Sequence, residues 1–330
     1  MSPALPPPGT TGVVLLNMGG PDRQEDVRPF LYNLFCDRDI IRLGPLFMQK
    51  PLAWLISWRR APKSMVNYAR IGGGSPLKAI TERQALALAE ALRGDGDFMV
   101  TLAMRYWGPS AENALSEMLA GKVERLVLLT LYPHFSKATT GSSLAECYRQ
   151  LQRLAPRLPV QCIDSWPEQP SYLRALAETV EEGRKAFGAD SKPTLLYSAH
   201  SLPVSLIEEG DPYVDHLHRT IASLERLTGM PGRLCYQSRS GPVQWLGPST
   251  AEMIASLAGE GCRDILVLPI SFVSDHIETL YEIDMLFREQ AAALGMRLRS
   301  CPSLNDRGTF IAALRELVLG TVSVTPATGS

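Results

Sequence analysis

Residues 265–284 read ILVLPISFVSDHIETLYEID, and the organisation of this stretch decides the fold that we predict. It opens on an unbroken apolar run over 265–270, which is typical of a strand buried on both faces of a parallel sheet. Polar side chains follow at once, among them His276, Glu278 and Glu282. Because open α/β sheets bind their ligands at the carboxyl ends of their strands, these side chains are candidates for chemistry.

A shorter stretch upstream has the same organisation. Residues 194–203, TLLYSAHSLP, begin apolar and then present His200. Each stretch alone has a simpler interpretation, because a lone histidine is more often structural and Asp275 followed by Glu278 resembles a helix capping box. The two stretches together favour a site, and we expect His200 and Glu278 to face each other across one cleft.

The rest of the chain repeats this alternation of strand and helix. Predicted strands lie at 12–17, 99–104, 125–131, 160–163, 194–199, 233–237, 265–270 and 297–300. Predicted helices lie at 22–35, 81–92, 142–154, 172–187, 212–227, 249–258, 276–294 and 309–319. Strict alternation implies parallel sheets with right-handed crossovers. We therefore predict an α/β fold of two similar, doubly wound, Rossmann-like halves with a ligand cleft between them.

Pro156 and Pro159 mark the predicted boundary between the two halves. The predicted organisation is a disordered lead at 1–11, an N-terminal α/β half at 12–157 with an apolar lip at 40–60, a C-terminal α/β half at 158–304, a helix packed back on the body at 305–321, and a loose tail at 322–330.

The composition excludes several classes of protein. Apolar residues make up 45% of the chain and charged residues 20%, which is ordinary for a globular protein. A formal net charge of −1 provides no field to attract nucleic acid. Six scattered cysteines without a C-x-x-C pair indicate a reducing compartment. Residues 1–11 lack the features of a signal peptide, and no apolar run reaches the about 18–20 residues that span a bilayer. We expect a cytoplasmic monomer.

Two segments of the first half have open interpretations. Apolar side chains crowd residues 40–58, and Arg59, Arg60 and Lys63 follow directly. This segment is either a core helix or an amphipathic lip that faces lipid or an apolar substrate. Residues 68–76, YARIGGGSP, lack the strand and the spacing of a phosphate-binding loop. We interpret them as a flexible loop that lets the backbone approach something closely.

Polar and aromatic residues gather at the predicted carboxyl ends of the strands. They are Met18, Arg105, Tyr106, Tyr132, His134, His200, Ser238, Phe272 and His276, and Trp245 would add another face. Their character predicts a flat, mostly hydrophobic ligand with a few polar anchors. Arg59, Arg60 and Arg105 are candidates to receive its carboxylates.

A histidine beside a carboxylate suits two kinds of chemistry. Imidazole and carboxylate groups bind borderline divalent metals such as Fe(II), and together they can abstract and carry protons. A permanent structural metal site needs about four ligands, and His200 with Glu278 supplies only two. The pair is therefore adequate for a metal in transit.

Six motifs resemble those of the ferrochelatase family, which inserts Fe(II) into a porphyrin in the final step of haem synthesis. They are LLNMGGP at 15–21, RIGGGSP at 70–76, TTGSS at 139–143, SAHSLP at 198–203, GPVQWLGP at 241–248 and SDHIETLYEID at 274–284. The resemblance covers about residues 12–319. The NMGGP form is similar to the branch that uses protoporphyrin rather than the branch that uses coproporphyrin.

The resemblance implies roles for individual residues. His200 and Glu278 fall on the pair assigned to metal delivery and pyrrole deprotonation, and Glu282 falls on the carboxylate ladder behind them. The positions that line the pocket are Met18, Tyr68, Arg105, Tyr132, Phe272 and His276. The segment 40–60 falls on an apolar lip that favours substrate entry from the membrane surface, which implies peripheral contact with the inner face of the membrane.

One departure from the family concerns cofactors. Some members hold an iron–sulfur cluster through cysteines near the C-terminus and one beside the TTGSS motif. Here Lys137 occupies that last position and no cysteine follows Cys301. We predict no cluster and no permanently bound cofactor, with Fe(II) and a porphyrin as substrates. A non-catalytic porphyrin or haem carrier is the alternative, because a carrier needs the pocket but not the acid–base pair.

Overall fold

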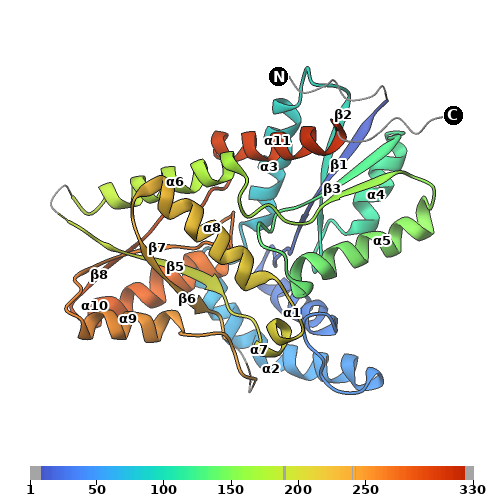
Figure 1. Cartoon of the computed structure of the whole chain (residues 1–330). Coiled ribbons are helices and arrows are strands. Elements are labelled where there is room, and N and C mark those ends of the chain that lie inside the picture. The colour runs from blue at the N-terminus through green and yellow to red at the C-terminus, as the bar shows by residue number, and fades with distance from the viewer. Residues whose placement is uncertain (1–8, 189–190, 240, 242, 324–330) are drawn as a thin grey trace.

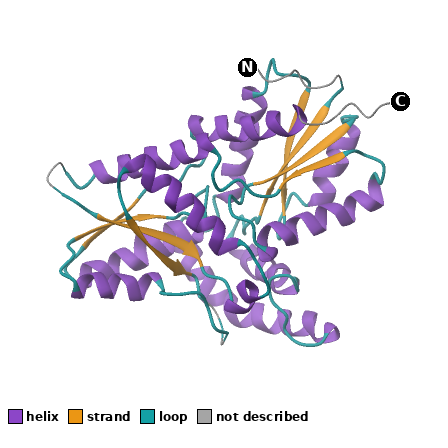
Figure 2. Ribbon diagram, in the orientation of Figure 1, coloured by secondary structure: helices purple, strands orange, loops and turns teal. Residues whose placement is uncertain are grey.

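The strands form two separate, four-stranded, fully parallel sheets in the part of the chain that the computed structural model describes, residues 9–188, 191–239, 241 and 243–323 (Figure 1, Figure 2). The first sheet has the order β2-β1-β3-β4, with β1 (Thr11–Asn17), β2 (Phe98–Met104), β3 (Arg125–Thr130) and β4 (Val160–Ile163). The second has the order β6-β5-β7-β8, with β5 (Thr194–His200), β6 (Gly232–Gln237), β7 (Asp264–Leu268) and β8 (Arg297–Ser300). The two halves therefore share one strand order, which confirms the predicted fold class.

Helices connect the strands in both halves. In the first half they are η1 (Gln24–Asp26), α1 (Val27–Cys36), η2 (Leu46–Met48), α2 (Gln49–Arg70), α3 (Leu77–Ala91), α4 (Ala111–Ala120), η3 (Lys137–Gly141) and α5 (Ser142–Leu154). Later in the chain they are α6 (Pro170–Lys185), α7 (Val204–Glu208), α8 (Tyr213–Thr228), α9 (Thr250–Gly259), η4 (Glu278–Phe287), α10 (Arg288–Ala293) and α11 (Gly308–Ser323).

One hydrophobic core extends from the first sheet to the second. It includes Leu15 of β1, Leu129 of β3, Tyr197 of β5 and Leu266 of β7, all fully buried. Phe310 of α11 belongs to the same core, and α11 packs against both α3 and α6 (Figure 1). The last helix thus packs back on the body and joins the two halves. The predicted residue boundaries of the domains stay predictions, and residues 1–8 and 324–330 of the expected lead and tail lie outside the described residues.

The long helix predicted at 276–294 is present, but most of it is not α-helical. Residues 278–287 form the π-helix η4, and the α-helix α10 follows from Arg288. The first half has a π-helix, η3, in the corresponding position between its third strand and α5. Apolar periodicity does not separate i→i+4 from i→i+5 hydrogen bonding, so the sequence pattern missed this difference. π-Helical turns are rare and occur often at functional sites.

The segment 40–60 is not a core helix. Leu46 is 74% exposed, Phe47 77% and Trp58 56%, although all three are large and apolar. The helix α2 starts at Gln49 and continues to Arg70, beyond the end predicted from the sequence. The exposure of these side chains argues against the core-helix interpretation, and what the segment faces stays a prediction.

The two glycine-containing loops of the first half dock on each other. The Ser75 N–H donates to the Pro21 carbonyl at 2.7 Å. A Cβ atom on Gly74 would lie 2.1 Å from the carbonyl oxygen of Asp22, so only glycine fits there. The sequence predicts that the backbone of the loop at residues 68–76 lies close to another group, and that group is the loop that follows β1.

Candidate active site

His200 and Glu278 meet at the carboxyl edge of the second sheet. His200 is the last residue of β5, and Glu278 is the first residue of η4, which follows β7. The Nδ1 atom of His200 lies 2.8 Å from Oε2 of Glu278. The His200 side chain is 36% exposed and that of Glu278 is 15% exposed. Since β5 and β7 are adjacent parallel strands, their ends deliver both side chains to one place.

The two groups stabilise each other's charged forms. Burial by itself lowers the pKa of His200, but the Glu278 carboxylate outweighs burial and the net pKa is raised. Burial by itself raises the pKa of Glu278, but His200, with His276 and the Ser238 hydroxyl, outweighs burial and brings the Glu278 pKa to about 2. The carboxylate therefore stabilises the imidazolium that forms when His200 takes up a proton, which makes His200 a stronger base than a free histidine.

Ser238 and Glu282 extend this pair into a longer path. The Ser238 hydroxyl lies 2.7 Å from Oε2 of Glu278 and 2.7 Å from Oε2 of Glu282. A hydroxyl has one proton to donate, so the two short contacts are both satisfied when one carboxyl group is protonated. Burial and the Glu278 charge raise the pKa of Glu282 to about 7, which marks Glu282 as the protonated partner. The sequence predicted Ser238 as a substrate contact, whereas here its hydroxyl bridges the two carboxylates.

Side chains that the sequence analysis did not single out hold this pair in place. The Ser271 hydroxyl accepts the backbone N–H of His200 at 2.9 Å, and the Tyr213 hydroxyl donates to the His200 carbonyl at 3.0 Å. The side-chain amide of Gln237 donates to the Glu278 carbonyl at 3.3 Å. These contacts hold the backbone of both residues of the pair. They cannot be predicted from local sequence patterns, because the partners come from distant parts of the chain.

Phe272 lies between the two histidines of the site. Its ring centroid is 4.3 Å from that of His276 and 6.4 Å from that of His200. The Nδ1 atom of His276 is 3.0 Å from the Ser274 carbonyl, so Nδ1 carries the proton and Nε2 is a free acceptor. That Nε2 atom is buried and lacks a partner among the described residues. Burial lowers the pKa of His276 and keeps the ring neutral.

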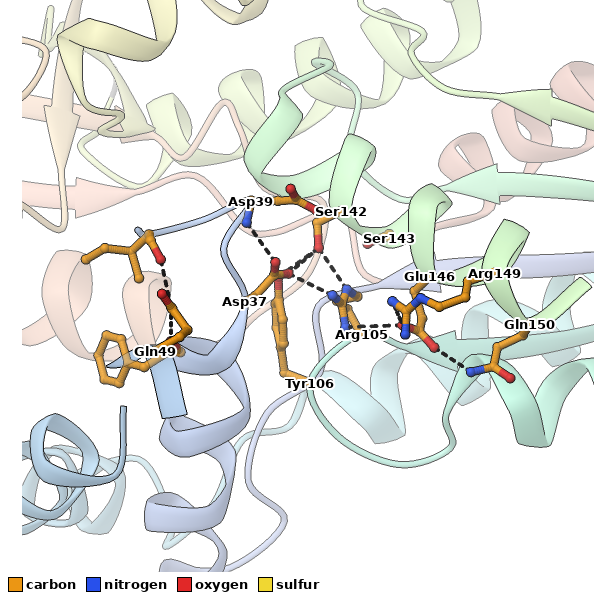
Figure 3. Close-up of polar contacts among 12 residues, drawn as sticks. Asp37, Asp39, Gln49, Arg105, Tyr106, Ser142, Ser143, Glu146, Arg149 and Gln150 are labelled. Atoms are coloured by element: carbon orange, nitrogen blue, oxygen red, sulfur yellow. Dashed lines mark hydrogen bonds and ion pairs between the residues drawn. The ribbon is translucent and has the colours of Figure 1, made fainter. Parts of the chain in front are cut away.

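Arg105 is held by side chains of the protein itself (Figure 3). Its Nη2 donates to Oδ2 of Asp37 at 2.8 Å, and its Nε donates to the Ser142 hydroxyl at 2.7 Å. Glu146 lies 3.9 Å from Nη1. Asp37 also accepts from the hydroxyls of Tyr106 and Ser142. Burial by itself raises the pKa of Asp37, but these two bonds, with the Asp39 N–H and the Arg105 charge, outweigh burial and lower it. The charge of Arg105 is therefore balanced internally.

Arg105 lines a cavity on the first half of the molecule. This cavity has a volume of about 610 Å³, and its lining includes Asn33 and Trp107 together with Arg105. Neither His200 nor Glu278 lines it. The structure gives the Arg105 guanidinium partners on α1 and α5, and its contact with a ligand carboxylate stays a prediction.

The helix α2 of the first half reaches the second-half site. Tyr68 is buried, and its pKa is raised by burial and by the nearby Glu278 charge. Arg70 pairs with Glu289 at 2.8 Å and lies over the ring of Tyr281, 5.2 Å from the ring centroid. The end of α2 is thus packed against η4, so the two halves meet where the His200–Glu278 pair lies.

The remaining predicted ligand contacts lie in varied surroundings. The Tyr132 hydroxyl is 3.5 Å from that of Ser143, and the partly buried Trp245 pairs with Pro203 in an isolated bridge. Met18 follows β1 and is partly buried. Arg59 is exposed on α2, and Arg60 lies over the ring of Phe35, 5.4 Å from its centroid. Within the described ranges, no three His, Cys, Asp or Glu side chains are grouped to hold a metal ion.

This fold, with an imidazole and carboxylates at its strand ends, defines the class of the chelatases. SirB from Bacillus subtilis with Fe3+ has the same fold, with a TM-score of 0.52 at 12% identity, over 73% of this chain and 90% of that one. The chain belongs to the ferrochelatase family, because the family model described as Ferrochelatase matches residues 10–322. It is therefore an enzyme, a metal chelatase of the lyase class.

Relatives over nearly the whole length support the same assignment. A ferrochelatase of Desulfotalea psychrophila is 59% identical over 309 residues, which cover 94% of this chain and 96% of the relative. A ferrochelatase of Geotalea uraniireducens is 49% identical over 318 residues, which cover 96% of this chain and 99% of the relative.

Proposed function

We propose that this chain inserts Fe(II) into protoporphyrin IX and releases protohaem and two protons. Family membership supports the ferrochelatase reaction, and the hydrogen-bonded path from His200 to Glu282 is the observation that carries the chemistry. In this reaction two pyrrole N–H bonds break, the nitrogen electron pairs bind the entering Fe(II), and no electron is transferred.

His200 is the proposed first proton acceptor. Its Nδ1 is engaged by Glu278, so Nε2 is the atom that takes a pyrrole proton. The neighbouring carboxylate stabilises the imidazolium that results, as in other histidine–carboxylate pairs. The proton then passes through Glu278 and the Ser238 hydroxyl to Glu282, whose pKa of about 7 suits release near neutral pH.

His200 and Glu278 are also the proposed contacts of the iron on its way to the porphyrin. A neutral imidazole and a carboxylate are donors that Fe(II) accepts, and two donors hold the ion weakly enough to hand it on. We propose Met18, Tyr68, Tyr132, Trp245, Phe272 and His276 as the surfaces against which the macrocycle binds. Their aromatic and apolar groups suit a flat ring.

One assay tests the reaction and its substrate. The purified protein is mixed with Fe(II) and either protoporphyrin or coproporphyrin, and the absorbance of the metal-free porphyrin is followed. We expect faster loss of protoporphyrin. Faster turnover of coproporphyrin would assign the chain to the other branch, and binding of either porphyrin without turnover would identify a carrier.

We further propose that the lip contacts a membrane surface. We define the lip as the exposed apolar side chains Leu46, Phe47, Trp54, Leu55 and Trp58 on η2 and α2. Lys50, Arg59 and Lys63 are exposed on the same helix and suit anionic head groups. No helix in the described ranges has both the length and the apolarity to cross a bilayer. Peripheral contact with the inner face of the membrane, from the cytoplasm, is the mode that we propose.

The chain is further proposed to act as a monomer without a resident cofactor. The proposal of no iron–sulfur cluster rests on Lys137, which is exposed at the start of η3, and on the lack of any cysteine after Cys301. Bound iron and acid-labile sulfide in the purified enzyme, at equal and stoichiometric amounts, would contradict it. Light scattering of the same sample tests the oligomeric state.

A further inference from the structure

The segment that precedes the candidate catalytic residues is clamped by Asn305. Residues 273–275 lie in the loop between β7 and η4, just before His276. Asn305 lies further along the chain, between β8 and α11. The Asn305 N–H donates to the Val273 carbonyl at 2.8 Å. Its side-chain oxygen accepts the Asp275 N–H at 2.9 Å, and its side-chain nitrogen donates to Oδ2 of Asp275 at 2.9 Å. One asparagine thus binds the backbone and the side chain of this segment.

Gln84, from α3 of the first half, completes the clamp. It is fully buried, and its side-chain nitrogen donates to the Asn305 carbonyl at 2.7 Å and to the Ser274 hydroxyl at 2.9 Å. Its side-chain oxygen is buried and lacks a partner among the described residues. A buried acceptor without a partner is destabilising. Both N–H groups of the Gln84 side chain are therefore used to bind Ser274 and Asn305, and its oxygen is left without a hydrogen bond among the described residues.

The backbone of Asn305 is adapted to these contacts. Its φ of 45° lies in the left-handed region, where asparagine is tolerated better than most residues other than glycine. In this conformation its N–H reaches Val273, its carbonyl reaches Gln84 and its side chain reaches Asp275. The backbone N–H, the carbonyl and both side-chain polar atoms of Asn305 thus serve the same contact region.

The clamped segment in turn orients the site. The Ser274 carbonyl, which lies within the segment, fixes the tautomer of His276 through Nδ1. The Thr279 hydroxyl contacts Oδ1 of Asp275 at 3.4 Å and accepts the His276 N–H at 3.0 Å. The first turn of η4, which begins at Glu278, is therefore built on the clamp.

We propose that Asn305 is a positioning residue for the metal-insertion site, acting through residues 273–275 on His276 and Glu278. This inference rests on the proposed function, since it assumes that His276 and Glu278 belong to the site. A displacement of reacting groups by about 1 Å can cost about 100-fold in rate, so a residue that touches no substrate can control turnover.

The test exchanges the members of the Asn305–Asp275 pair. Asn305→Asp replaces the donor that faces Oδ2 of Asp275 by a carboxylate oxygen, and we expect kcat for Fe(II) insertion to fall about 100-fold. Asp275→Asn alone retains an acceptor for the Asn305 amide and should have a smaller effect. The double variant again places one amide donor opposite one carboxylate acceptor, so we expect kcat to recover most of the loss.

The activity of each variant is measured at saturating porphyrin and at a temperature below its measured thermal unfolding midpoint. A purely structural role would lower the midpoint and leave kcat per folded molecule unchanged, which would overturn the proposal, as would a double variant without recovery. Asn305→Gly keeps the left-handed backbone without introducing charge, and it decides the question if Asn305→Asp does not fold. We expect Asn305→Gly to lower kcat and Asp275→Asn not to rescue it.

Two controls separate this inference from the proposed function. Asp306→Asn removes the 3.2 Å pair with Arg83 from the neighbouring residue, does not touch residues 273–275, and should leave kcat unchanged. His200→Ala reports on the site itself. If His200→Ala abolishes turnover and the folded Asn305 variants keep it, only the positioning role is wrong. If His200→Ala also keeps full turnover, the proposed site is wrong.

Discussion

The imidazole of His200 and the carboxylate of Glu278 come from positions 78 residues apart and are joined by one 2.8 Å contact. They meet because β5 and β7 are neighbours in the second sheet and run in the same direction. The contact leaves Nε2 of His200 for the substrate, and the Ser238 hydroxyl carries the path on to Glu282.

Replacing His200 by alanine should abolish insertion and spare porphyrin binding. Removal of a general base costs about 100-fold to 10,000-fold in rate. The measurement is turnover of protoporphyrin with Fe(II), beside a fluorescence titration of porphyrin binding. His218→Ala is the matched control, because His218 is exposed on α8 and should keep full activity. Equal turnover in both variants would remove His200 from the mechanism.

Ser238→Ala should interrupt the proton path and leave both carboxylates in place. The two 2.7 Å contacts of the hydroxyl are lost, so Glu278 and Glu282 face each other without a bridge. We expect kcat to fall about 100-fold, in the range of a single general acid–base contribution. Ser205→Ala, on the exposed face of α7, serves as the control. An unchanged kcat for Ser238→Ala would show that protons leave by another route.

Asp37→Asn should destabilise the fold near neutral pH. The change leaves Arg105 without its closest carboxylate, and breaking a buried pair of this kind costs about 3–5 kcal/mol. The folded pKa of Asp37 lies below its ordinary value of 3.8, so its contribution is present above that value and is lost as the pH falls through the folded pKa. The free energies of unfolding of the two proteins should therefore converge in acid.

Urea unfolding from neutral pH to well below pH 3.8, the ordinary pKa of Asp37, measures this convergence. Asp39→Asn is the matched control, since Asp39 is exposed two residues away and contributes its backbone N–H rather than its carboxylate to the network. The assigned role of the Asp37 charge would be contradicted if the free energies of unfolding of Asp37→Asn and the parent protein differed by the same amount at every pH.

Phe47→Ser combined with Trp58→Ser should weaken binding to anionic vesicles without lowering the unfolding midpoint. Both side chains are more than half exposed, so their removal from the lip costs little in the folded protein. Co-sedimentation with vesicles that contain anionic lipid measures the binding. Leu86→Ser is the control, as Leu86 is 73% exposed on α3 and lies outside the lip. If the control weakens binding as much as the lip variant, the lip is not the contact surface.

Much of the fold follows from local patterns in the sequence. The apolar runs that became β1, β3, β5 and β7 are buried on both faces, and burial on both faces is readable from an unbroken run. Strand ends of parallel neighbours share one edge, so His200 and Glu278 could be paired before any coordinates were known. The motifs that resemble ferrochelatases are likewise local strings of residues.

The tertiary structure alone decided the partners of charged and polar side chains. In the folded protein Arg105 pairs with Asp37, and the Ser238 hydroxyl contacts two carboxylates. Asn305 and Gln84 hydrogen-bond to residues 273–275. Local periodicity records whether a side chain is buried, because each strand or helix turns its faces at a fixed interval. It does not record what a side chain binds, because hydrogen bonds and ion pairs depend on the position of segments brought from elsewhere in the chain.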